Sequence, residues 1–144
     1  MLKTTVFVVA MLSGGAATAQ LMPGSVDRSK MAPNMAMPGQ IREAKALVQM
    51  MATAKACGLS SPKVQEGTAF IDGWNRTHIH PDGRPMTQAM AGVADMSKFN
   101  ASPAKPMLCR AAAAELNAPK TIRSIDTKVA YLKRCGPAYR GNMC

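Results

Sequence analysis

The stretch 41–57, IREAKALVQMMATAKAC, decides the fold of this chain. Its apolar residues recur at intervals of three and four, which places them on one face of a helix. They are Ile41, Ala44, Leu47, Val48, Met51 and Ala54. Charged and polar residues such as Arg42 and Lys45 fall mostly on the other side. Gly58 follows and predicts the helix end, because glycine readily adopts the left-handed conformation of a helix cap.

Further helices are expected downstream of this one. Ser61-Pro62 is typical of a helix start, with serine as N-cap and proline in the first turn. Three more helical patterns cover residues 86–98, 103–117 and 120–135. A turn-rich loop over residues 76–85 precedes the first of them, and His80-Pro81-Asp82-Gly83 is its strongest turn signal. No segment shows a clear strand pattern. The sequence therefore predicts an all-α fold, a small bundle of four or five short helices.

The start of the chain has the three-part layout of a secretory signal peptide. Lys3 gives a short basic region, an apolar run follows to Leu12, and Ala17-Thr18-Ala19 offers the small residues of a cleavage site. We expect residues 1–19 to be removed, so that the mature protein starts at Gln20 and is periplasmic or secreted. A membrane anchor needs roughly 20 apolar residues, and this apolar run ends at Leu12, so a cleaved signal is favoured over an anchor. No later stretch is expected to span a membrane.

The mature chain divides into two parts. Residues 20–39 are rich in Met, Pro and Gly and show little periodicity, which predicts a flexible arm. Residues 40–144 form the predicted helical domain.

Four cysteines in a chain with a secretory signal favour two disulfides. Three pairings are open, and we expect Cys57–Cys109 and Cys135–Cys144. The first would tie the end of an early helix to a later one. The second would close a short loop, since Gly136-Pro137 turns the chain directly after Cys135.

Basic residues concentrate in the C-terminal third. The formal net charge is +10, and residues 98–144 carry nine basic residues against Glu115 and Asp126. This imbalance favours an anionic neighbour, either an unknown protein or an anionic component of the cell envelope. The expected contact residues are Arg123, Lys128, Lys133, Arg134 and Arg140. The alternative is a solvated basic surface without a dedicated partner. Specific nucleic-acid binding is not expected, because aromatic residues are only 4% of the chain.

Methionine and histidine suggest a second function, the handling of copper. Met31, Met35 and Met37 lie in the predicted arm, and His78 and His80 lie in the loop. Thioether sulfur is a soft ligand that selects Cu(I), and imidazole also suits copper. The competing interpretation is that these methionines only fill space, since methionine is a flexible core residue.

An enzyme is the least favoured class. No glycine-rich nucleophile turn accompanies the His80-Pro81-Asp82-Gly83 sequence, which turn formation alone explains, and the acidic residues are not paired as glycoside hydrolysis requires. The expected function is therefore that of an exported, non-catalytic helical protein without a cofactor, with copper handling as the alternative.

Overall fold

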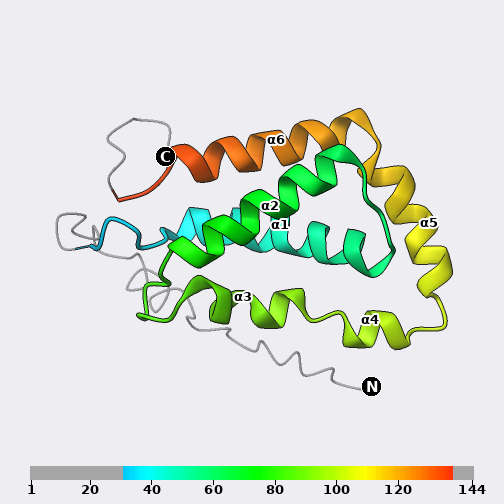
Figure 1. Cartoon of the computed structure of the whole chain (residues 1–144), viewed down its shortest axis with the longest axis horizontal. Coiled ribbons are helices and arrows are strands. Elements are labelled where there is room, and N and C mark those ends of the chain that lie inside the picture. Colours follow the sequence, from blue (N-terminus) through cyan, green and yellow to red (C-terminus); the bar gives the residue numbers. More distant parts are fainter. Residues whose placement is uncertain (1–30, 138–144) are drawn as a thin grey trace, which may run out of the picture.

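The computed structural model describes residues 31–137. The described chain is all-α, as expected, and its helices are α1 (Pro38–Ala56), α2 (Pro62–Thr77), α3 (Met86–Ala94), α4 (Ser97–Ala101), α5 (Lys105–Leu116) and α6 (Pro119–Arg134). Five of them have nine residues or more, and α4 is an additional piece of five residues. Figure 1 shows α1 and α2 in the middle, with α6 along one side of them, α3 and α4 along the other, and α5 closing one end.

Helix α1 begins three residues earlier than the sequence pattern predicts. The backbone N–H of Met37 donates to Oε1 of Gln40 at 2.9 Å, and Gln40 is almost fully buried. The preceding residues also pack against the domain, since Ala36 is fully buried and Met35 forms a backbone bridge with Ile79. The part of the predicted arm within the described residues is therefore in contact with the helices; residues 20–30 and the predicted signal peptide lie outside the described residues.

The other end of α1 and the start of α2 follow the sequence prediction. Gly58 has a φ of 67°, and the N–H of Leu59 reaches back to the carbonyl of Ala54 at 2.9 Å. The hydroxyl of Ser61 then accepts a hydrogen bond from the N–H of Val64 at 3.3 Å and caps α2. These caps satisfy backbone groups that a helix end leaves without partners.

The helix predicted over residues 86–98 is wrong in its extent. Helix α3 ends at Ala94, and the Asp95 carboxylate accepts from the N–H of Ser97 at 2.9 Å, where α4 begins. A short acidic side chain that bonds to a nearby backbone N–H competes with helix continuation. The later helices match the prediction to within a few residues at their N-terminal ends.

The core forms around α1, which contacts α2, α3, α5 and α6. Its largest fully buried side chains are Leu47, Ile71, Met86, Ile125 and Gln40. Gly67 of α2 faces α1 closely: a Cβ at this position would lie 3.0 Å from the sulfur of Met51. Glycine therefore allows a close approach of the two helices here, although it lowers helix propensity.

The predicted disulfide Cys57–Cys109 is confirmed. The two Cα atoms are 5.3 Å apart, and the bridge joins the C-cap of α1 to α5 across 52 residues of sequence. The second predicted bridge, Cys135–Cys144, stays a prediction, because Cys144 lies outside the described residues.

Candidate functional site

The predicted anionic contact set does not form one surface. Arg123 and Arg134 are exposed and eleven residues apart, which is about three helical turns, so they lie on the same outer face of α6. Lys133 is placed over the ring of Phe70 in α2, with its Nζ 5.5 Å from the ring centroid. Lys128 faces α1 instead, and Arg140 lies outside the described residues.

Lys128 forms an ion pair that sequence reasoning did not foresee. Its Nζ lies 2.7 Å from Oε2 of Glu43, and both side chains are only about one-fifth exposed. The hydrogen bond from Lys128 lowers the pKa of the Glu43 carboxyl against the opposing effect of burial, and Arg42 adds to the lowering. This contact joins α6 to α1, so Lys128 has an acidic partner, which the other cations of α6 lack within the described residues.

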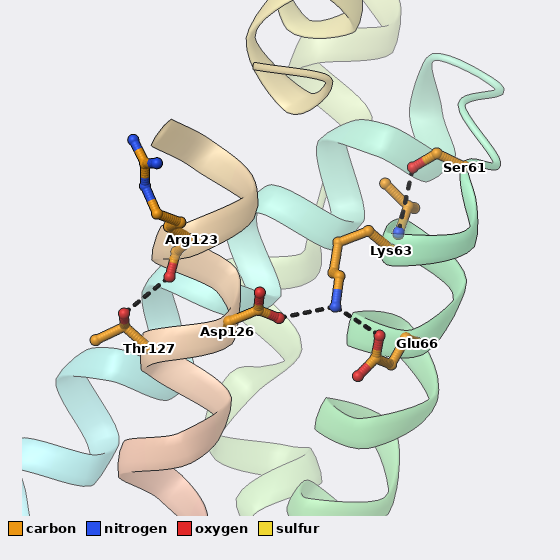
Figure 2. A network of polar contacts seen from close by, with 7 residues as sticks. Ser61, Lys63, Glu66, Arg123, Asp126 and Thr127 are labelled. Atoms are coloured by element: carbon orange, nitrogen blue, oxygen red, sulfur yellow. Dashed lines mark hydrogen bonds and ion pairs between the residues drawn. The ribbon is translucent and has the colours of Figure 1, made fainter. Parts of the chain in front are cut away.

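The acidic residue of α6 is also paired, with a lysine of α2. Figure 2 shows Lys63 between two carboxylates, those of Glu66 and Asp126, with Nζ–oxygen distances of 2.7 and 2.8 Å. Both bonds raise the pKa of Lys63, the one to Asp126 more strongly. In the same view the side chain of Arg123 extends away from this network. Asp126 is the acidic residue of α6, and it is paired with Lys63. Arg123 and Arg134 therefore have no acidic partner on their own helix.

Helix α5 carries exposed apolar side chains near its start. Met107 is 65% and Leu108 40% exposed, and Leu116 is the buried residue of the helix. Lys105 and Arg110 lie on the same helix and form no ion pair within residues 31–137. Cations beside exposed apolar side chains are typical of surfaces that contact other molecules.

The methionine segment and the histidine loop are brought together by backbone contacts. The N–H of Ile79, the residue between the two histidines, donates to the carbonyl of Asn34 at 2.9 Å. The N–H of Ala36 donates to the carbonyl of Ile79 at 2.7 Å, which completes a parallel bridge between Met35 and Ile79. Two of the predicted copper-binding segments are therefore neighbours.

The ring of His78 is held by contacts with Trp74, at the end of α2. Its ring stacks on Trp74 at a centroid distance of 4.2 Å, and its Nδ1 lies 2.9 Å from the carbonyl oxygen of Trp74. A carbonyl can only accept, so this contact favours the neutral tautomer that carries its proton on Nδ1, and the Thr77 hydroxyl also lies 3.1 Å from this nitrogen. Burial lowers the pKa of His78, with the bond to Trp74 opposing it, which favours the neutral ring.

His80 is used differently, within its turn. Its Nδ1 lies 2.9 Å from the Asp82 carboxylate, and Arg84 bonds the other oxygen of the same carboxylate. The hydrogen bonds from Arg84 hold the pKa of Asp82 well below its usual range. Gly83 completes the turn with a φ of 89°. Among residues 31–137, no group of three or more His, Cys, Asp or Glu side chains is arranged to hold a metal.

Within the described residues no helix has both the length and the apolar character needed to cross a membrane.

The chain was also compared with known proteins. No family model, curated protein or solved structure matches it. Functional inference therefore rests on the residues themselves.

A second feature that the sequence did not predict is a groove between α1, α2 and α3, which Asn75 lines. A signal was present: Val64, Thr68, Ile71 and Asn75 recur at helical spacing, so the apolar face of α2 continues into an asparagine. A polar residue at a core position indicates a partner or a site, because a buried polar group without a hydrogen bond is costly.

Proposed function

We propose that this protein is exported and acts without catalysis, by binding an anionic macromolecule or surface through cations of its C-terminal helices. The observation that carries the proposal is the number of these cations that are exposed and form no ion pair within residues 31–137. They are Lys98, Arg110, Lys120, Arg123, Lys133 and Arg134. Unpaired cations raise the local positive potential and attract anionic partners.

The N-terminal half of the described chain has a different balance. Arg42, Lys63 and Arg84 each bond a carboxylate, which leaves Lys45, Lys55 and Arg76 without an ion pair there. Carboxylates therefore neutralise three of the basic side chains in that half, Arg42, Lys63 and Arg84. Export is supported by the Cys57–Cys109 bridge, since disulfides persist mainly in oxidising compartments.

The test is the binding of a soluble polyanion, heparin, measured by titration calorimetry at several salt concentrations. Replacing Arg123, Lys133 and Arg134 by Gln should weaken binding about tenfold, since three exposed charge contacts of about 0.5 kcal/mol each are lost. A matched control replaces Lys45, Lys55 and Arg76 by Gln and makes the same change in net charge. Arg140 is the next residue to add to the first set.

Two results would contradict the proposal. Equal weakening by both triple variants would show that only net charge matters. Binding that does not change between 0.05 and 0.5 M salt would also contradict it, because exposed charge attraction is screened over about 10 Å at 0.1 M.

The bridge between Met35 and Ile79 supports a second candidate, the binding of Cu(I) by Met31, Met35, Met37, His78 and His80. The unprotonated Nε2 of His78 suits a metal ligand. Replacing the three methionines by Ile keeps their bulk and removes the sulfur, so Cu(I) affinity in a competition titration should fall. The control replaces Met96 and Met107 by Ile. If the wild-type protein and both variants bind Cu(I) with equal affinity, or none of them binds it, these methionines serve only in packing.

A further inference from the structure

The groove between the first three helices has the size and lining of a binding site. Its volume is about 780 Å³, within the range of sites for small ligands and short peptide segments. The deepest lining residues are apolar and almost fully buried: Val48 and Met51 of α1, Ile71 of α2 and Met90 of α3. Methionine is adaptable and common on surfaces that accept varied apolar side chains.

Asn75 is the polar residue that this lining does not explain. It is 7% exposed, and its Oδ1 is buried without a hydrogen-bond partner within the described residues. An unpaired buried amide oxygen is unfavourable, so a ligand that donates a hydrogen bond to it would bind more tightly. Asn75 lines the groove, and the χ2 torsion that orients its amide is soft, so the amide can reorient when a ligand binds.

The chemistry of the site matches a peptide bond. A carboxamide offers two donors and an acceptor, which is the complement of a backbone N–H and C=O. The charged side chains of the lining have both signs, with Asp72 and Arg76 from α2 and Lys55 from α1, so the groove does not favour a ligand of one charge. These three side chains form no ion pair within residues 31–137.

We propose that the α1–α2–α3 groove binds a short extended segment of apolar peptide, with the Asn75 amide bonded to one of its peptide groups. The groove follows α1 from Val48 to Ala56, eight residues or about 12 Å. An extended peptide rises about 3.3 Å per residue, so three or four residues fill that length. The proposal is independent of the basic surface on α5 and α6, since those helices do not line the groove.

The probe is acetyl-trileucine amide, titrated into the protein and followed by calorimetry. Ala91 of α3 is exposed and lines the groove, so Ala91→Trp should fill it and abolish binding. Gln88→Trp adds the same bulk to the same helix outside the groove and should leave the affinity unchanged. Thermal unfolding of both variants confirms that they remain folded.

Asn75 is tested from both sides of the contact. Asn75→Leu should weaken binding about tenfold through loss of its hydrogen bonds, whereas Gln49→Leu, on the exposed side of α1, should not. An ester oxygen in place of one backbone N–H of the probe should cause a similar loss at one position, and this loss should disappear in Asn75→Leu.

Three outcomes would overturn the proposal. One is no binding of the probe at millimolar concentration, and another is undiminished binding by Ala91→Trp. The third is equal binding of decanoate or decylamine, which would show a groove for aliphatic chains rather than for peptide.

Discussion

Helices α5 and α6 are attached to the same central helix by different means. Helix α6 packs Ile125, Val129 and Leu132 into the core and adds the Lys128–Glu43 ion pair. Helix α5 buries only Leu116 and is linked to α1 by the Cys57–Cys109 disulfide. Packing holds one helix and a covalent bond holds the other. Helix α5 contributes little else to the core, and Met107 and Leu108 stay exposed on its surface.

The largest expected effect comes from removing the covalent link. Replacing Cys57 and Cys109 by Ser should lower the free energy of unfolding by about 4 kcal/mol, the chain-entropy value for a loop of this length. Chemical denaturation measures it. Hydrogen exchange should rise first in α5, whose contacts are sparse. Uniform exchange across all helices would show that α5 is held by packing after all.

Helix α6 should respond to the loss of packing instead. Ile125 is 1% exposed, and Ile125→Ala should cost about 3 kcal/mol through lost burial and a residual cavity. Leu108→Ala in α5 is the matched control, with an expected change under about 0.5 kcal/mol because the side chain is exposed. Similar losses from the two substitutions, measured by urea denaturation, would contradict the contrast between the helices.

The ion pair should contribute less. Lys128→Met keeps the aliphatic length and removes the charge, and it should lower stability by about 1 kcal/mol at neutral pH, the upper range for partly exposed pairs. Because the folded pKa of Glu43 is lowered, its contribution is present above the ordinary value of 4.5 and is lost as pH falls through the folded pKa. Denaturation of both proteins between pH 7 and 3 checks this. If the difference in free energy of unfolding between the two proteins stays constant over this pH range, the effect of Lys128 does not depend on the charge of Glu43.

The exposed residues of α5 should matter least for stability and more for binding. Replacing Met107 and Leu108 by Ser should change the free energy of unfolding by under about 0.5 kcal/mol. The same change should weaken binding to vesicles of anionic phospholipid while leaving heparin binding intact, because only the vesicle offers an apolar phase. A loss of more than 2 kcal/mol in stability would show that these side chains belong to the core.

Local signals in the sequence predicted much of the fold. The spacing in α1, the Ser61-Pro62 start and the Gly58 cap depend on nearby residues, and the structure confirms them. The Cys57–Cys109 bridge joins residues 52 positions apart, and it was predicted from the expected places of the two cysteines in their helices. The earlier start of α1 was missed because it depends on the bond from Met37 to the buried Gln40.

The candidate sites were less predictable because they depend on contacts between distant residues. Lys128 resembles the other cations of α6 in the sequence, and only the packing of α6 on α1 brings it to Glu43, 85 residues away. The groove arises from three helices together, and no single segment encodes it. The bridge between Met35 and Ile79, which brings the methionine segment next to the histidine loop, also joins residues far apart in the sequence and was not predicted.

The central claim, that exposed cations of the C-terminal helices bind an anionic partner, is tested most directly by nuclear magnetic resonance. The protein, labelled with ¹⁵N, is titrated with a short heparin oligosaccharide at 0.05 M salt, and backbone amide shifts are followed. The account predicts the largest shifts on the outer face of α6, around Arg123 and Arg134, and near Arg110 of α5, with little change around Lys45. Shifts spread evenly over the molecule, or concentrated on α1 and α3, would contradict it.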